Sequence, residues 1–379
     1  MPWKEATTVS QRLEFVTLAG RGEANISRLC HRFGISRKTG YKWLHRFEEG
    51  GPNALQDHSR RPHHSPNRMP ESIERAILRV RDAHPAWGAR KIRARLVAQG
   101  LTNLPSVSTI TAVLHRNGRI DPEEALKHRA WQRFQAEAAN LLWQIDFKGH
   151  FPLVCGRCHP LTVLDDHSRF LLAVQACGDE TWHTVQGHLT TAFRCYGLPQ
   201  GMLMDNGSPW GSDQAHPHTP LTAWLIRLGI KVIHSRPYHP QTLGKSERFN
   251  RTLKAEVIGQ RLFQDLQECQ KHFDRWRYVY NFQRPHEALG MLVPASRYCV
   301  SLRDFPETLP PIEYGATDIV RKVQGKGEIY FRNRPFKVGG AFRGYPVALR
   351  PTLTDGVFDV FFCQQQVAEI NLKEHNLQT

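Results

Sequence analysis

Three acidic residues stand where their carboxylates could act together on a phosphodiester: Asp146, Asp205 and Glu247. Asp146 lies in an alternating strand pattern, Asp205 ends an apolar run, and Glu247 lies in a helical pattern. Adjacent parallel strands can bring the two aspartates together, and a helix over their ends can add the glutamate. Two Mg²⁺ ions held by such carboxylates activate the attacking oxygen and stabilise the leaving oxygen of a phosphoryl transfer.

Each of these acids alone has an ordinary explanation. Asp146 could be a solvated edge residue, Asp205 could serve the Asn206-Gly207 turn, and Glu247 could pair with Arg251. Two further acids, Asp165 and Asp166, fit a hairpin turn without a metal, so we do not include them as ligands.

Cations surround Glu247 at Lys245, Arg248, Arg251 and Lys254. They could form ion pairs within the helix, or they could hold a polyanion on which the metal acts. The formal charge of +16 and the pI near 9.7 favour a polyanionic partner. Residues 1–140 contain 24 Lys and Arg against 13 Asp and Glu, so most of the excess lies there.

The sequence lacks the apolar run of a signal peptide and any stretch approaching the ~20 apolar residues of a membrane span. We therefore expect a cytoplasmic, nucleoid-associated protein. Of the eight cysteines only Cys155 and Cys158 are close together, which predicts reduced thiols. Their segment "CGRCH" resembles half a zinc site without its other half, and a hairpin turn is the favoured interpretation.

The first third of the chain predicts two helical DNA-binding units. In residues 25–47 a helical face ends at Gly34, and Ser36 can cap a second, basic helix over 37–47. The alternative is a helical hairpin with a solvated basic face. The DNA-contact candidates are Ser36, Arg37, Lys38 and Lys42.

Residues 57–70 are rich in Pro, His and Arg, which predicts an extended linker. Its Arg60 and Arg61 are candidates for contacts with DNA phosphates. A second helix-turn-helix candidate follows, with a reading helix over 108–117 that Ser108 can cap and Gly118 can stop. A plain three-helix packing module is the alternative. Ser106, Ser108 and Thr109 are the further DNA-contact candidates.

From about residue 140 strands come first and then helices alternate with strands, as in a mixed α/β domain. Five ordered motifs in this region resemble the core of bacterial insertion-sequence transposases of the DDE type, relatives of retroviral integrase. They are "WQIDFKGHF", "LTVLDDHSRF", "LMDNGSPWG", "RPYHPQTLGKSERFNRTLKAE" and "YNFQRPHEALGMLVPASRY". The resemblance covers about residues 9–300 and implies a ribonuclease-H-like core with Asp146, Asp205 and Glu247 as the metal-binding triad.

One departure concerns the third acid. Between Asp205 and Glu247 lie 41 residues, more than in retroviral integrases, and the surplus is expected in the 209–220 loop. Glu256 is the alternative ligand, although it lacks the preceding "HPQTLGKS". The resemblance further implies Mg²⁺, with Mn²⁺ as a substitute, double-stranded DNA at element ends and target, and a dimer or tetramer on DNA.

The predicted organisation is multidomain: all-α helix-turn-helix units, a mixed α/β ribonuclease-H-like catalytic core and a small β-rich C-terminal domain. The expected segments are 1–56 and 71–120 for the helical domains, 57–70 for the basic linker, 121–139 for a connection, 140–300 for the core and 301–379 for the C-terminal domain. Two functions remain open: a DNA transposase that cleaves and joins element ends, or a catalytically silent protein that occupies them.

Overall fold

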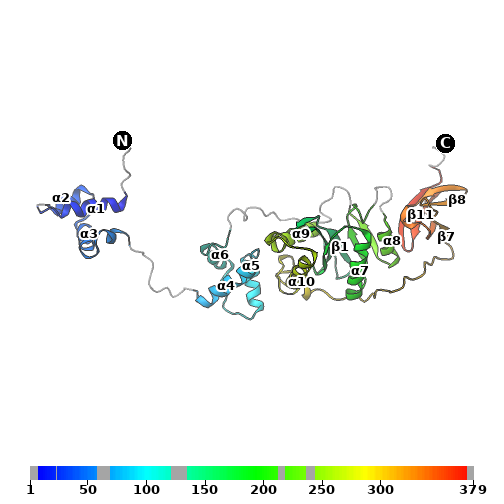
Figure 1. Cartoon of the computed structure of the whole chain (residues 1–379), viewed down its shortest axis with the longest axis horizontal. Helices are drawn as coiled ribbons and strands as arrows, with labels where there is room; N and C mark the ends of the chain where they lie inside the picture. The colour runs from blue at the N-terminus through cyan, green and yellow to red at the C-terminus, as the bar shows by residue number, and fades with distance from the viewer. Residues whose placement is uncertain are drawn as a thin grey trace. The chain divides into compact units, whose positions relative to one another are not determined.

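The computed structural model describes residues 7–22, 24–57, 69–120, 135–211, 218–235 and 244–373 (Figure 1). The chain folds as two compact units, Met1–Arg68 and Met69–Thr379, and each is described by itself. In the described part of the chain no helix is long and apolar enough to cross a membrane. Arg60, Arg61 and the rest of 58–68 lie outside the described residues.

The first unit is a small helical domain around Phe15, Cys30 and Trp43, which are buried. The Ser36 hydroxyl accepts from the Thr39 amide at 3.1 Å, so this side chain caps the third helix as its position predicted. That helix continues to Gly50, beyond the expected end at 47. Its elements are α1 (Thr8–Ala19), α2 (Ile26–Arg32), α3 (Arg37–Gly50) and the short η1 (Gly51–Leu55).

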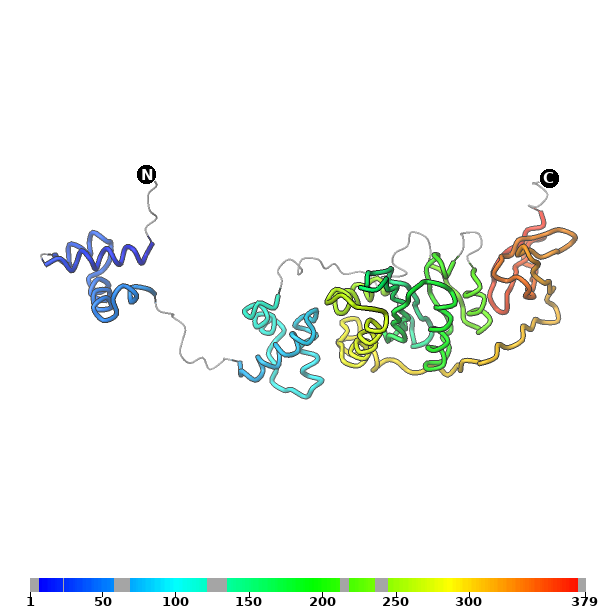
Figure 2. Tube along the Cα trace, viewed as in Figure 1, coloured from blue at the N-terminus to red at the C-terminus, as the bar shows by residue number. Residues whose placement is uncertain are grey.

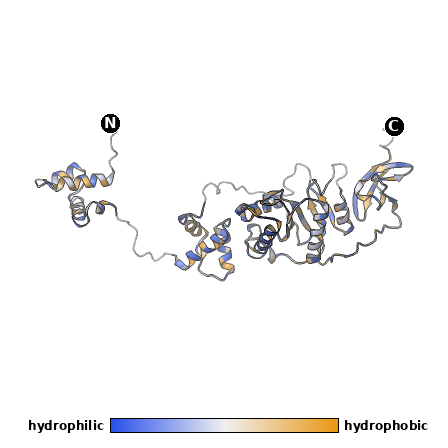
Figure 3. Cartoon of the chain, viewed as in Figure 1, coloured by the Kyte–Doolittle hydropathy of each residue, from blue (hydrophilic) through white to orange (hydrophobic). Residues whose placement is uncertain are grey.

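The second unit opens with three helices packed around Ile77, Trp87 and Ile110, none of which is exposed. Hydrophilic and hydrophobic residues share each of these helices in Figure 3, as amphipathic helices around a small core require. The last helix is capped by Ser106, not by Ser108: the Ser106 hydroxyl accepts from the Thr109 amide at 3.2 Å. The helices are α4 (Glu71–Ala83), α5 (Ala89–Ala98) and α6 (Val107–Arg116).

A mixed sheet follows, in which antiparallel strands come first and parallel strands come last. β1 pairs antiparallel with β3 and parallel with β5, and β5 pairs parallel with β6. β2 and β4 both pair antiparallel with β3. The strands are β1 (Leu142–Phe147), β2 (Phe151–Leu153), β3 (Gly156–Asp165), β4 (Leu171–Cys177), β5 (Gly201–Met204) and β6 (Lys231–His234).

Helices cover both faces of this sheet. Trp143 and Ile145 of β1 pack in one core with α7 and α8, whereas Leu164 and Val174 pack in another with α9 and α10. The expected alternation along β1 is therefore confirmed. The helices are α7 (Trp182–Tyr196), α8 (Pro220–Arg227), α9 (Gly244–Glu256) and α10 (Leu266–Phe282), with the short η4 (Ile258–Gln260), η5 (Glu287–Leu289) and η6 (Pro294–Ser296).

Segment 297–318 runs without helix or strand to a small β domain (Figure 2). There β12, β11, β10 and β7 form an antiparallel sheet beside the β8–β9 hairpin. The Gln365 side chain bonds both the N–H and the C=O of Val232 at 2.9 and 3.1 Å, so this domain covers the outer edge of β6. Its elements are β7 (Ile319–Lys322), β8 (Glu328–Phe331), β9 (Arg334–Lys337), η7 (Gly340–Phe342), β10 (Pro346–Pro351), β11 (Val357–Phe362) and β12 (Gln365–Asn371).

The predicted fold class is thus confirmed: helical units, a mixed α/β core and a small β domain. The hairpin expected at "CGRCH" is also confirmed, because β2 and β3 pair across the turn at residues 154–155, and Gly156 to His159 form the start of β3. Cys155 is exposed there, whereas Cys158 is buried with its Sγ 3.9 Å from that of Cys269.

Candidate active site

Asp146 lies on β1, on the face of the sheet opposite to Trp143 and Ile145. Its side chain is half-buried, and one carboxylate oxygen accepts from Asn250 Nδ2 at 2.8 Å. Thr162 Oγ1 of the neighbouring β3 donates to the Asp146 carbonyl at 3.1 Å. A strand that is bonded on both edges fixes the direction of this carboxylate.

Asp205 directly follows β5, the parallel neighbour of β1. Gln144 pairs with Leu203, so the same register continued by two residues brings Asp146 level with Asp205. The turn after the strand holds the Asp205 carboxylate, because the Gly207 amide donates to it at 3.0 Å. Gly211 closes this turn so tightly that a Cβ there would lie 2.3 Å from the Asn206 carbonyl oxygen.

Glu247 is exposed in the first turn of α9, which runs along the polar side of β1. Ser246 Oγ donates to Gln144 Oε1 at 2.9 Å, and one turn later Asn250 donates to Asp146. Glu247 stands between these two contacts. The helix therefore packs along β1 beside Asp146, and the charge of Glu247 acts on the Asp146 carboxylate.

The electrostatics of Asp146 indicate a cluster of negative charge. Burial raises the pKa of Asp146 to about 7, against the Asn250 hydrogen bond, and the charges of Asp205 and Glu247 raise it further. Burial also raises the pKa of Asp205, which the Gly207 amide and then His234 lower. The charges of the other two predicted acids thus both act on Asp146.

The donor set suits a hard divalent cation, because carboxylate oxygens are the ligands that Mg²⁺ prefers. A cation would offset the burial, and then the neighbouring negative charges, that raise the pKa of Asp146. The Asn250 Oδ1 is buried beside this site and has no hydrogen-bond partner among the described residues. Within the described ranges no three His, Cys, Asp or Glu side chains lie close enough together to chelate an ion.

Glu256, the alternative third acid, is occupied elsewhere. Its carboxylate accepts from Arg284 Nε and from Trp276 Nε1, both at 2.9 Å, and it is 8 % exposed. Those bonds hold the last turn of α9 against α10 and the loop after it. Arg284 thereby fixes the loop after α10 through Glu256.

The structure contradicts the surface role expected for Lys245. Its ammonium bonds the Asp166 carboxylate, and the Lys245 side chain is only 15 % exposed. Burial lowers the pKa of Lys245 to about 8, against the opposing effect of Asp166. Lys245 faces inward because Asp166 is fully buried and needs a cation, which a solvated turn residue would not.

The other cations of α9, Arg248, Arg251 and Lys254, are exposed. Two further residues near the acids escaped sequence reasoning. Lys148 is half-buried, and the Lys254 charge adds to the burial that lowers the pKa of Lys148. Glu180, which bonds His159 Nδ1 at 2.7 Å, acts electrostatically on both aspartates. The position of Lys148, two residues after Asp146, was the available signal for it.

The first helical unit presents its predicted DNA contacts at the start of α3. Ser36, Arg37, Lys38 and Lys42 are exposed there. In the second unit Ser106, Ser108 and Thr109 are exposed at the start of α6. Ser36 and Ser106 each accept from a backbone amide within their own helix end, so both have a capping role whatever they contact.

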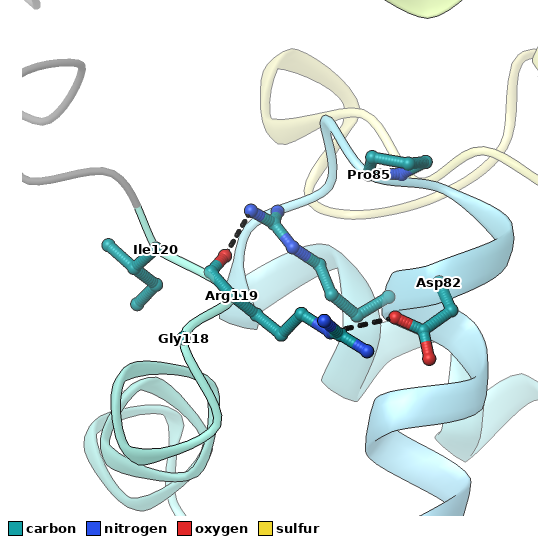
Figure 4. A pocket seen from close by; sticks show the side chains of 6 residues that line it. Asp82, Pro85, Gly118, Arg119 and Ile120 are labelled. Atoms are coloured by element: carbon teal, nitrogen blue, oxygen red, sulfur yellow. Dashed lines mark hydrogen bonds and ion pairs between the residues drawn. The ribbon is translucent and has the colours of Figure 1, made fainter.

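A hollow of about 490 Å³ lies in the second helical unit (Figure 4). Arg119 Nε bonds Asp82 at 2.9 Å across it, and Arg81 donates to the Arg119 carbonyl. None of the three carboxylates lines this hollow, so it has no part in their chemistry. Its lining residues are Arg81, Asp82, Pro85, Gly118, Arg119 and Ile120.

Comparison with family models finds domains in the predicted order. A helix-turn-helix domain matches residues 11–63 and a homeodomain-like domain matches 39–114. Integrase core domains match 136–240 and 228–294, and the C-terminal domain of IS481 family transposases matches 318–378.

Curated relatives include proteins of two bacterial insertion elements. An IS407 protein of 31.7 kDa from Burkholderia multivorans is 27% identical over 42% of this chain and 55% of its own length. An IS476 protein of 39.2 kDa from Xanthomonas euvesicatoria is 28% identical over 41% of this chain and 43% of its own length. A Gag-Pro-Pol polyprotein of sheep pulmonary adenomatosis virus is 31% identical over 38% of this chain and 8% of its own length. The chain thus spans about half the length of these bacterial relatives.

Among solved structures, a simian T-cell lymphotropic virus intasome with a PP2A regulatory subunit is 16% identical, covering 78% of this chain and 96% of that one, at a TM-score of 0.39. The HTLV-2 integrase catalytic core with magnesium is 14% identical, covering 42% of this chain and 97% of that one, at a TM-score of 0.31. Likenesses of this size carry no argument about function. The family models and the insertion-element relatives confirm the resemblance to DDE-type insertion-sequence transposases.

Proposed function

We propose that this chain is a DNA transposase of an insertion sequence. It binds the terminal inverted repeats, cleaves the phosphodiester at the 3′ ends and transfers the 3′ hydroxyls to target DNA. Asp146, Asp205 and Glu247 hold divalent metal, Mg²⁺ by preference with Mn²⁺ as a substitute. The observation that supports the proposal is that Asp146 and Asp205 lie level on adjacent parallel strands and that the charges of Asp205 and of Glu247 on α9 both act on Asp146.

In the first step a water oxygen attacks the phosphorus and the 3′ oxygen leaves. In the second step the freed 3′ hydroxyl attacks a target phosphorus, and the target P–O3′ bond breaks to release a target 3′ hydroxyl. Bound metal would neutralise charge on the entering and leaving oxygens. Asn250 orients Asp146 by its hydrogen bond, and the Gly207 amide orients Asp205. Exposed Lys254 and Arg251 on α9 are available to the phosphates on either side of the reacting one.

The helical units supply DNA recognition. The starts of α3 and α6 carry exposed polar and basic side chains, which suit base edges and phosphates. Two element ends must be held together for joining, so the working form is a dimer or tetramer on DNA. These assignments support double-stranded DNA as the partner and a cytoplasmic place of action.

A nicking assay on DNA that contains an element end tests this function. The wild-type protein should cut at the end only when Mg²⁺ or Mn²⁺ is present. A protein that binds end DNA and never nicks it in either metal would instead be the silent occupant of element ends.

A further inference from the structure

Asp166 is a fully enclosed acid beside the proposed site. It is 0% exposed, and its carboxylate accepts from the Ala136 amide and from Gln144 Nε2, both at 2.7 Å, as well as from the Lys245 ammonium. These three donors come from three separate segments of the core. The turn between β3 and β4 thus ties the start of α9 to β1.

Two polar contacts continue this tie along the helix. Ser246 bonds Gln144 and Asn250 bonds Asp146, so helix positions four apart meet strand positions two apart. Four helix residues rise about 6 Å and two strand residues rise about 6.7 Å, so the two spacings match. The far end of α9 is held by the buried Glu256–Arg284 pair.

Stability alone does not explain buried charges at this place. Transferring an ion pair from water into the protein interior has a desolvation cost that apolar side chains do not have. Buried ion pairs therefore contribute little to the free energy of unfolding. They do specify one arrangement, because any other leaves a buried charge without a partner. A rotation of α9 by one residue, about 100°, would break the contacts that Lys245, Ser246 and Asn250 make and would change the direction of Glu247.

We infer that Asp166 and Lys245, with Gln144 and Ser246, are positioning residues that fix the register of α9 and hence the place of Glu247 beside Asp146. This inference rests on the proposed function for its catalytic consequence. The helix register itself does not depend on that function. We call Gln144, Asp166, Lys245 and Ser246 the register lock.

The central test is the double variant Asp166→Asn/Lys245→Met, which removes both charges and leaves neither one buried alone. We expect it to melt near the wild-type temperature and to bind end DNA with unchanged affinity. Its nicking rate in Mg²⁺ should fall on the order of 100-fold, because small misplacements of a catalytic group have effects of that size. Amide hydrogen exchange over residues 244–256 should be faster.

The matched control is Arg194→Met/Glu307→Gln, which removes an exposed ion pair of the same core. It should leave nicking and α9 exchange at wild-type values. If the central double variant does not fold, Ser246→Ala takes its place, with an expected loss of about tenfold in nicking for one lost buried hydrogen bond.

Wild-type nicking together with wild-type α9 exchange in the folded lock variant would overturn the inference and leave the proposed function standing. If the wild-type protein itself never nicks, the proposed function fails. Amide exchange then tests the register lock independently of nicking. Faster exchange of α9 in the Asp166→Asn/Lys245→Met variant would support the inference that the lock fixes the helix, and unchanged exchange would overturn it.

Discussion

Glu247 and Glu256 lie on the same helix in opposite surroundings. Glu247 is exposed beside Asp146, whereas Glu256 is buried against Arg284 and Trp276. An exposed carboxylate near other acids gains little from its protein neighbours and is available to a metal. A buried carboxylate with two donors serves the fold. The same substitution at the two positions should therefore have different effects.

We expect Glu247→Gln to abolish nicking and joining in Mg²⁺ and Mn²⁺, because the amide removes a charged ligand with little change in shape. Binding of end DNA should survive, since the helical units lie elsewhere in the chain. Nicking and gel-shift assays on the same DNA measure both. Cleavage by Glu247→Gln at the wild-type rate would remove Glu247 from the site.

Glu256→Gln should act on stability instead, because it leaves Arg284 buried and uncompensated. Loss of one partner of a buried pair costs on the order of 3–5 kcal/mol. Denaturant unfolding monitored by tryptophan fluorescence would report the loss. A variant as stable as the wild type but unable to nick would mean that Glu256 is the third ligand.

At the scale of elements, Gly40 decides how closely the first three helices pack. It lies inside α3, where alanine normally stabilises a helix by about 1 kcal/mol. Here a Cβ would lie 2.4 Å from Cys30 Sγ and 3.0 Å from Phe15 Cζ, so α3 must move away from α2 and α1. We expect Gly40→Ala to lower the melting temperature of the first unit, and an unchanged or higher value would contradict this contact.

The junction between the core and the β domain contains a half-buried histidine pair. The rings of His218 and His234 lie 5.9 Å apart, and His218 packs against Phe342 of η7 at 5.3 Å. Burial, and then the charge of His234, lower the pKa of His218 to about 4. Within the described residues His218 Nδ1 has no hydrogen-bond partner. The folded protein therefore keeps this ring neutral.

This junction should weaken in acid. The unfolded chain titrates His218 near pH 6.5, so between pH 6.5 and 4 it binds more protons than the folded chain. The stability from neutral His218 is present above pH 6.5 and is lost as pH falls towards 4, by at most about 3 kcal/mol. Calorimetry from pH 7 to 5 should show a shallower decline for His218→Gln than for wild type. Equal pH dependence of stability in the two proteins would exclude His218 as a source of the loss in acid.

On the scale of the whole molecule, charge is unevenly distributed. Residues 1–140 hold a net charge of +11 out of +16. If these cations face phosphates, binding should weaken steeply with salt, with a log–log slope close to the number of phosphates neutralised. Binding isotherms of the full chain between about 50 and 200 mM salt give that slope. Affinity that does not change over this range would show that the excess charge lies away from DNA.

The sequence by itself determined what depends on short-range periodicity. Alternation in 142–147 placed Asp146 on the polar side of β1, and Ser36 marked the start of a helix. The strands-then-helices order of the core also follows from local patterns, because hydrophobic period and cap residues are readable within a few residues. The family motifs then identified which acids belong together.

Only the tertiary structure decided which charges are used internally. Asp166 was predicted only as a residue of a hairpin turn and Lys245 as a phosphate contact, yet they bond each other across 79 residues of sequence. Glu256 likewise finds Arg284 28 residues away. A side chain's partner depends on which distant segments pack around it and exclude water. That long-range packing decides whether a charge meets solvent, DNA or another buried charge.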